Sequence, residues 1–221
     1  MDLSDLYHEA TFTMVGRMTM LIEPIKELLP TDGIVIDAGC SNGTTTLELA
    51  YLFERNVIGI DQNRPGEDIE ERGIGFGDFL NSRARSIAGN EDGKVQLLQR
   101  VSFKEIDMFS DDMTSLPKPK MIIMANNILN KINGLNIGLS DVRFHIARAL
   151  RPSISILEDG GILLLASDSS GSSGRSYIIL QKHLNTVNLI GDSEFYNTRS
   201  NVSFNNLQLI EQEINARVKE L

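Results

Sequence analysis

The chain has 221 residues, of which 41% are hydrophobic and 23% charged, and this composition is typical of a globular protein with a core. Its single cysteine, Cys40, excludes a disulfide framework and a multi-thiolate metal site, and its three histidines are scattered. The formal net charge of -9 disfavours nucleic acid as a partner. A polar, acidic N-terminus and short apolar runs predict a cytoplasmic protein with neither an export signal nor a membrane span.

Short apolar runs alternate with helical and irregular segments along the chain. This alternation predicts an α/β fold: a Rossmann-like, doubly wound and mainly parallel sheet with helices on both faces. Strands are expected at residues 33–37, 56–60, 101–106, 121–125 and 161–166.

Helices are expected around these strands. One covers residues 44–52, and another begins near Ser140 and ends where Pro152 stops it. The N-terminal segment up to residue 29 is typical of two helical pieces divided near Pro24. Residues 62–100 form a long connection with one helical stretch at 79–87.

The remainder of the chain completes a single expected domain, residues 1–221. The serine-rich segment 167–176 is expected to be a loop. Residues 177–180 and 185–190 are candidate edge strands, and a helical stripe follows near the C-terminus. Within the domain we expect an N-terminal helical lid (1–30), a cofactor-binding core (31–168) and C-terminal edge strands with a helix (169–221).

The most informative segment, VIDAGCSNGTTTLELA at residues 35–50, has a strand, a glycine-containing turn and a helix. Gly39 permits a tight turn, and Gly43 lets the backbone approach a ligand. The turn lacks the middle glycine of the dinucleotide fingerprint and the lysine of a P-loop. A nucleotide-like ligand without a pyrophosphate is therefore expected.

Two carboxylates flank this crevice. Asp37, just before the turn, would repel a phosphate and favours a cationic ligand, although it could instead cap the turn and the following helix. Asp61 lies about twenty positions further on, where a carboxylate accepts hydrogen bonds from ribose hydroxyls, although it could also be an ordinary loop residue. A ribose beside negative charge points to S-adenosyl-L-methionine.

Three segments, VIDAGCSNG, VIGID with Asp61, and KEIDMF with Asp107, resemble motifs I, II and III of class I S-adenosylmethionine-dependent methyltransferases. The resemblance implies that Asp107 bonds the adenine amino group, although an aspartate that ends a strand is also common turn chemistry. Cys40 is expected to be a small buried residue that contributes its backbone and is not a nucleophile. The expected cofactor-binding residues are Arg17, Asp37, Gly39, Cys40, Ser41, Gly43, Asp61, Gln62, Asp107, Met108, Asn126 and Asn127.

A closer resemblance covers roughly residues 8–166. HEATFTMVGRMTMLIEPIKELLP, AGCSNG, VSFKEIDMF, MIIMANNILNKI and IARALRP are similar, in order, to the chemotaxis receptor methyltransferase (CheR-type) family. The resemblance implies that Arg17 helps to hold the cofactor, although it could instead be a surface charge on a helix, and that Asn127 follows the fourth strand. That family methylates glutamate side chains on membrane receptors. Thr44 and Thr45 stand where it usually has two glutamates.

The sequence therefore predicts a methyltransferase with an unidentified acceptor. A carboxylate, on a protein glutamate or a small molecule, is one candidate because it is ionised near pH 7 and needs no general base. No catalytic residue and no metal are assigned. Two alternatives stay open: a regulatory protein that binds the cofactor without catalysis, and an NAD-dependent oxidoreductase.

Overall fold

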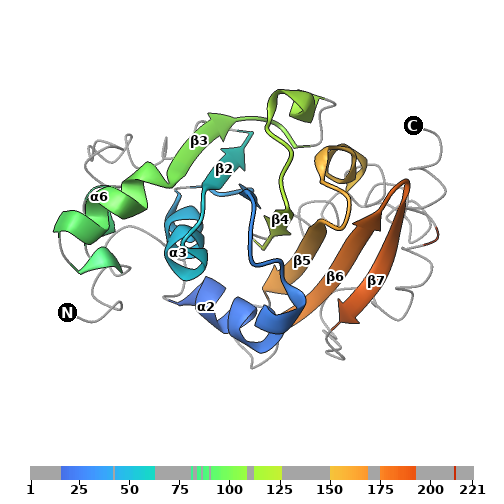
Figure 1. The fold of residues 1–221 in the computed structure, drawn as a ribbon, viewed down its shortest axis with the longest axis horizontal. Helices are drawn as coiled ribbons and strands as arrows, with labels where there is room; N and C mark the ends of the chain where they lie inside the picture. The colour runs from blue at the N-terminus through green and yellow to red at the C-terminus, as the bar shows by residue number, and fades with distance from the viewer. Residues whose placement is uncertain are drawn as a thin grey trace. The chain divides into compact units, whose positions relative to one another are not determined.

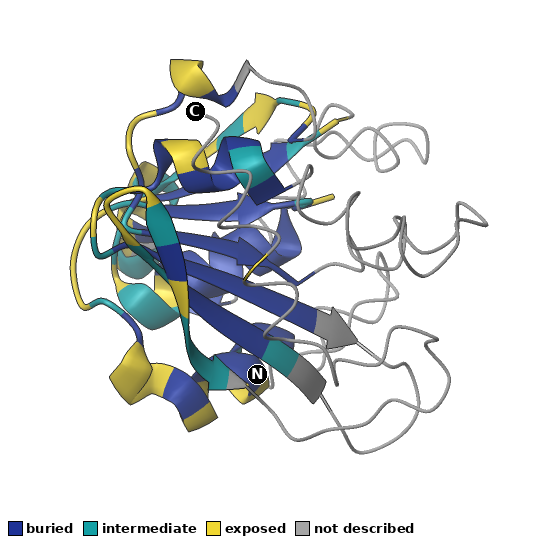
Figure 2. Ribbon diagram, turned by 90° about the vertical axis from the view of Figure 1, so that its right-hand side faces the viewer, coloured by how far each residue is buried: buried dark blue, intermediate teal, exposed yellow. Residues whose placement is uncertain are grey.

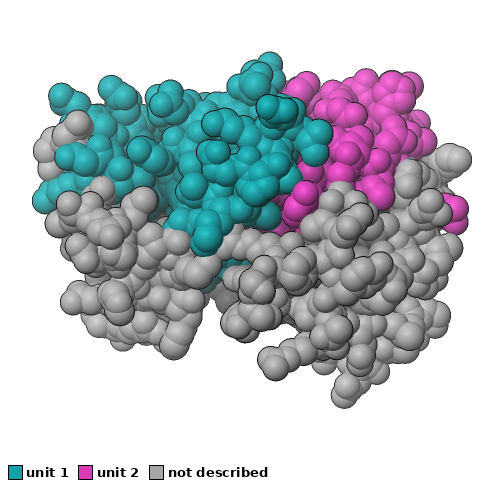
Figure 3. Space-filling model, turned by 90° about the horizontal axis from the view of Figure 1, so that it is seen from below, with its two compact units in different colours: residues 1–106 teal, residues 107–221 magenta. Residues whose placement is uncertain are grey.

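The computed structural model describes residues 16–41, 43–62, 81, 84–85, 87–89, 91–108, 112–125, 150–168, 175–192 and 212. The chain divides into two compact units, Met1–Ile106 and Asp107–Leu221, which Figure 3 colours separately. The prediction of one domain over residues 1–221 stays a prediction.

The first unit contains three parallel strands in the order β3-β2-β1. They are β1 (Val35–Ala38), β2 (Val57–Asp61) and β3 (Val101–Glu105), each within two residues of its predicted start. All four residues of β1 are buried, as expected of a strand in a parallel sheet. The register sets Asp37 of β1 beside Gly59 of β2.

Four helical segments accompany these strands: α2 (Arg17–Ile22), η1 (Glu23–Leu28), α3 (Thr44–Phe53) and α6 (Glu91–Gln99). Pro24 lies in the first turn of η1, where its missing N–H is not needed, and this confirms the division predicted there. The helix α3 is the predicted one. The helix α6 lies in the segment expected to be a long connection, which is therefore more helical than predicted.

The second unit contains β4 (Met121–Met124), β5 (Ile162–Asp168), β6 (Arg175–His183) and β7 (Thr186–Asp192), in that order (Figure 1). The pair β4–β5 is parallel, whereas β6 and β7 each run antiparallel to the preceding strand. A short helix, η2 (Asp112–Ser115), precedes β4. The parallel strands and helices of the first unit, and the parallel pair with antiparallel edge strands of the second, are those of the predicted Rossmann-like α/β fold.

Two local predictions in this unit are wrong. Pro152 lies inside the helical residues 150–156 and does not end them, because proline removes only its own N–H and Leu157 still donates to the carbonyl of Ser153. The expected loop at 167–176 is shorter than predicted: Ser167 and Asp168 belong to β5, and Arg175 and Ser176 pair with them from β6. Residues 169–174 lie outside the described residues.

The core follows strands β1, β2, β4 and β5, whose described residues are almost all buried, and Figure 2 shows strands in the buried colour at the centre of this core. The side chains of β4 are buried without exception. Lys182 of β6 donates to the carbonyls of Ile154, Ser155 and Leu157 at 2.9, 3.2 and 2.8 Å, which satisfies the end of the 150–156 helical segment. Among the described helices, none combines the length and apolarity needed to cross a membrane.

Candidate cofactor site

The turn after β1 is folded tightly against the end of β2. The amides of Gly39 and Cys40 both donate to the carbonyl of Ile60, at 2.8 and 3.0 Å, and the amide of Gly43 donates to the carbonyl of Cys40 at 2.9 Å. Gly39 and Gly43 have φ values of 76° and 79°, a region that glycine enters without the steric cost of a side chain. The glycines predicted to shape the turn therefore lie where the backbone requires them.

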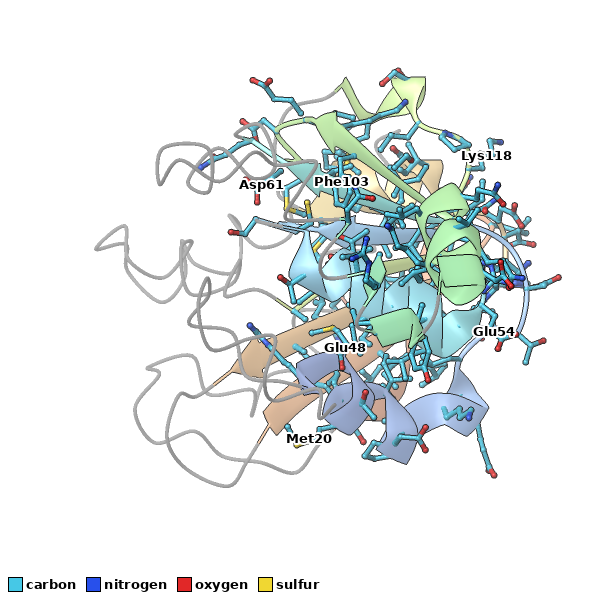
Figure 4. The ribbon with its side chains drawn as sticks, turned by 90° about the vertical axis from the view of Figure 1, so that its left-hand side faces the viewer. Met20, Glu48, Glu54, Asp61, Phe103 and Lys118 are labelled. Atoms are coloured by element: carbon cyan, nitrogen blue, oxygen red, sulfur yellow. The ribbon has the colours of Figure 1, made fainter. Side chains whose placement is uncertain are left out.

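Ser41 and Asp61 are brought together by this turn. The backbone amide of Ser41 donates to Oδ2 of Asp61 at 2.9 Å. Asp61 is the last residue of β2 and is partly exposed, and Figure 4 labels it there. Its carbonyl accepts a 2.8 Å bond from the amide of Ile106, which extends the pairing of β2 with the segment that follows β3.

Asp37 is buried completely and ties β1 to the first turn of α3. The hydroxyls of Thr45 and Thr46 each donate to its Oδ2 at 2.7 Å. Within the described part of the chain, its Oδ1 is buried and has no hydrogen-bond partner. Burial raises the pKa of Asp37 to about 6, although the two hydroxyls and the charge of Arg17 act to lower it. Both contacts are with side-chain hydroxyls in the first turn of α3, whereas a helix cap accepts backbone amides, and the N-cap residue Gly43 has no side-chain cap bond. One buried acceptor oxygen of Asp37 is left over.

Arg17 joins this region from α2. Its side chain is buried, and its positive charge is one of the influences that lower the pKa of Asp37. Two residues further along α2, the amide and the hydroxyl of Thr19 both donate to Oε1 of Glu48 on α3, each at 2.9 Å. Figure 4 labels Glu48 on α3 and Met20 on α2. The lid predicted for residues 1–30 is not confirmed, because residues 1–15 lie outside the described residues.

Cys40 packs below the turn. It is 1% exposed, and burial is the main cause that raises the pKa of its thiol. A Cβ added to Gly59 would lie 2.9 Å from its Sγ and 2.7 Å from both Thr46 Oγ1 and Phe103 Cδ1. A thiol held protonated in such close packing is not a nucleophile, in line with the expectation that Cys40 contributes only its backbone.

For the remaining predicted residues, the structure gives the exposure of three and does not describe two. Gln62 is exposed directly after β2. Asp107 is exposed and Met108 buried at the start of the second unit, while Asn126 and Asn127 lie outside the described residues. No group of three or more metal-ligating side chains occurs in the described ranges.

Sequence reasoning missed three contributors: Thr46, Glu48 and Gly59. The threonine run directly after the turn was a usable signal for a hydroxyl partner of Asp37. Glu48 and Gly59 carry no local signal, because their roles depend on which segments pack against them.

No family model matches the chain, and neither does any curated protein. Solved structures do match. The rRNA methyltransferase AviRa from Streptomyces viridochromogenes has a TM-score of 0.54 at 16% identity, over 82% of this chain and 93% of that one. A SAM-dependent methyltransferase from Methanosarcina mazei has a TM-score of 0.43 at 22% identity, over 65% of this chain and 56% of its own.

A third match is the geranyl diphosphate C-methyltransferase of Streptomyces coelicolor with bound S-adenosyl-L-homocysteine, with a TM-score of 0.44 and 15% identity over 75% of this chain. The chain spans 49% of that protein and about half of several others. Identities this low show a shared fold and no more, and only the AviRa match has a TM-score above 0.5 among these three. The chain has the Rossmann-like α/β fold that the methyltransferase AviRa also has.

Proposed function

We propose that the chain binds S-adenosyl-L-methionine in the turn between β1 and α3 and transfers its methyl group to an acceptor. The observation that supports this most is the bond from the Ser41 amide to Asp61, because it fixes a carboxylate at the mouth of a glycine-framed turn. A partly exposed carboxylate in that position suits two neighbouring ribose hydroxyls.

Each residue has a proposed task. Asp61 accepts the ribose hydroxyls, and the backbone from Gly39 to Gly43 passes close to the ligand. Buried Asp37, whose Oδ1 has no hydrogen-bond partner among the described residues, places negative charge beneath a cationic ligand. Arg17 holds the ligand's carboxylate by a charge-assisted bond. Gln62, Asp107, Met108, Asn126 and Asn127 complete the proposed set.

When bound, the cofactor supplies an electrophilic methyl group on a sulfonium sulfur. Asp61 and Arg17 would hold the rest of the cofactor, so that this methyl group could pass to the acceptor by in-line displacement from sulfur. The chain's part is to align the reactants and exclude water, which needs no elaborate set of acid–base groups.

The acceptor we propose is a carboxylate, which is already ionised near pH 7. The resemblance to chemotaxis receptor methyltransferases supports a glutamate side chain and rests on the sequence motifs. We also propose a cytoplasmic location. The net charge of -9 supports the proposal that nucleic acid is not the acceptor. AviRa is named an rRNA methyltransferase, so ribosomal RNA should be tested as an acceptor alongside carboxylates.

An NAD-dependent oxidoreductase is disfavoured by the turn. Where a dinucleotide fingerprint needs a bare glycine, this chain has Ser41, at a φ of 50° and with its amide bonded to Asp61. A regulatory protein that binds the cofactor without catalysis is the alternative that binding data alone do not separate.

Two measurements test the proposal. S-adenosylhomocysteine should raise the melting temperature of the full chain, whereas NAD should not, because only a ligand bound to the native state stabilises it. Methyl release from radiolabelled cofactor is then followed with peptides containing glutamate, small carboxylic acids and ribosomal RNA. Binding without transfer to any acceptor favours the regulatory alternative, and the absence of a thermal shift at millimolar ligand contradicts the proposal.

A further inference from the structure

A buried carboxylate links the N-terminal helix α2 to the site. Glu48 is 4% exposed on α3, and its Oε1 accepts both the amide and the hydroxyl of Thr19. A buried glutamate is uncommon unless it is paired, and here two directed bonds converge on one oxygen.

The helix α3 also bonds to Asp37 of β1. Thr45 and Glu48 are three residues apart on α3 and therefore lie on one side of that helix. Thr45 bonds Asp37, Glu48 bonds Thr19, and the charge of Arg17, two residues before Thr19, acts on Asp37. Hydrogen bonds thus connect β1 to α3 and α3 to α2, and the charge of Arg17 on α2 acts on Asp37 of β1.

Apolar packing alone would not fix α2 in this way. The helix has only six residues, and it buries Met18, Leu21 and Ile22 against the core. Such contacts are non-directional, whereas hydrogen bonds set the rotation and the longitudinal position of a helix. The position of Arg17, whose charge acts on Asp37, thus depends on the Thr19–Glu48 bonds.

We propose that Glu48 is a positioning residue, which holds α2 through Thr19 so that Arg17 reaches the carboxylate of the cofactor's amino-acid part. This inference rests on the proposed function. Glu48 itself does not contact the ligand in this proposal. Its loss should weaken the binding of the cofactor's amino-acid part and leave the binding of the nucleoside part unchanged.

The chain offers variants that separate the possibilities. Glu48→Gln keeps a carbonyl oxygen that accepts both Thr19 bonds, whereas Glu48→Ala removes the acceptor. Thr19→Val is milder, since it removes the hydroxyl and leaves the backbone amide. Glu27→Gln removes a charge from an exposed position in the same unit and serves as the control.

Two ligands report the effect: S-adenosylhomocysteine and 5′-methylthioadenosine, which has the same nucleoside and lacks the amino-acid part. By calorimetry, Glu48→Ala should weaken S-adenosylhomocysteine about tenfold and 5′-methylthioadenosine less than about twofold. Thr19→Val should show the same selectivity with a smaller loss, while Glu48→Gln and Glu27→Gln should bind as the wild type does. Carboxyl NMR of Asp37 should report a higher pKa in Glu48→Ala, because Arg17 has moved away.

The inference is contradicted if Glu48→Ala loses the same affinity for both ligands, or if Glu48→Gln loses as much affinity as Glu48→Ala. Either result leaves the proposed function intact. Should Glu48→Ala fail to fold, Thr19→Val decides by the same selectivity between the two ligands. A wild-type chain that binds neither ligand overturns the proposed function and this inference with it.

Discussion

The amide of Ser41 and the Oδ2 of Asp61 are joined by a 2.9 Å hydrogen bond that connects the turn after β1 to the end of β2. Ser41 adopts a left-handed conformation, with a φ of 50°, in making it. A carboxylate fixed in this way has lost part of its rotamer freedom before any ligand arrives, and such preorganisation favours binding. The site is therefore partly built by the backbone of the turn.

Gly39→Val tests the turn directly. A branched side chain at a φ of 76° is strained, so the free energy of unfolding should fall by about 1 to 3 kcal/mol and S-adenosylhomocysteine binding should be lost. Gly89→Val is the matched control: Gly89 has a φ of 73°, and no described atom lies within 4 Å of an added Cβ. Urea unfolding and calorimetry on both variants should show strain in each and lost binding only in Gly39→Val. Normal binding by Gly39→Val would mean that the ligand lies elsewhere.

Gly59→Ala tests the packing beneath the turn. Its new Cβ would lie 2.7 Å from Phe103 Cδ1 and Thr46 Oγ1, so overpacking should destabilise the chain by about 1 to 3 kcal/mol in urea unfolding. Ser102→Ala, at an exposed position on β3, should stay within about 0.5 kcal/mol of the wild type. Equal stability of the two variants would show that the space is looser than these distances imply.

Asp37→Asn tests the buried carboxylate. The pKa of Asp37 is raised in the folded chain to about 6 from 3.8, so the native state holds this proton more tightly than the unfolded state does. The stability it contributes is fully present below pH 3.8 and is lost as the pH rises through about 6, by about 3 kcal/mol in total. The wild type should therefore lose stability relative to Asp37→Asn across that window in urea titrations. A difference between the two chains that does not change with pH contradicts this account.

Cys40 should be inert in the native chain. Its thiol is buried, and desolvation is the main influence that raises its pKa, so little thiolate forms near neutral pH. Ellman's reagent at pH 8 should label the chain only after urea unfolding. Rapid stoichiometric labelling without denaturant would show that Cys40 is accessible and would reopen a catalytic role.

Most of the strands were predictable because they contain a short apolar run, and β4 with its wholly buried MIIM is the clearest case. The strand β3 (VSFKE) is the exception, since it is half polar and none of its residues is buried. The turn was predictable because Gly39 and Gly43 bracket a strand-to-helix change. The helix α6 was missed because Gly93 interrupts a polar sequence in which Val95 stays exposed and Leu97 is buried. Its helicity depends on packing more than on local pattern.

Long-range contacts account for the rest of the site. The sequence indicated that Asp37 either binds a ligand or caps a helix, and only the fold shows Thr45 and Thr46 bonded to it. The bonds between Thr19 and Glu48 span 29 residues and leave no periodic trace in the sequence. The end of the helix near Pro152 was misjudged because proline disturbs a helix on its N-terminal side and leaves the following turns intact.

The most direct test of the central claim is calorimetric titration of S-adenosylhomocysteine into the full chain and into Asp61→Ala, with Glu27→Gln as a charge control. The wild type and the control should bind one equivalent. Asp61→Ala should fold and bind about 1.5 to 3 kcal/mol more weakly, because the ribose hydroxyls lose a charged acceptor. Absence of binding by the wild type, or unchanged affinity in a folded Asp61→Ala chain, would contradict the claim that the turn after β1 and the end of β2 form a cofactor site.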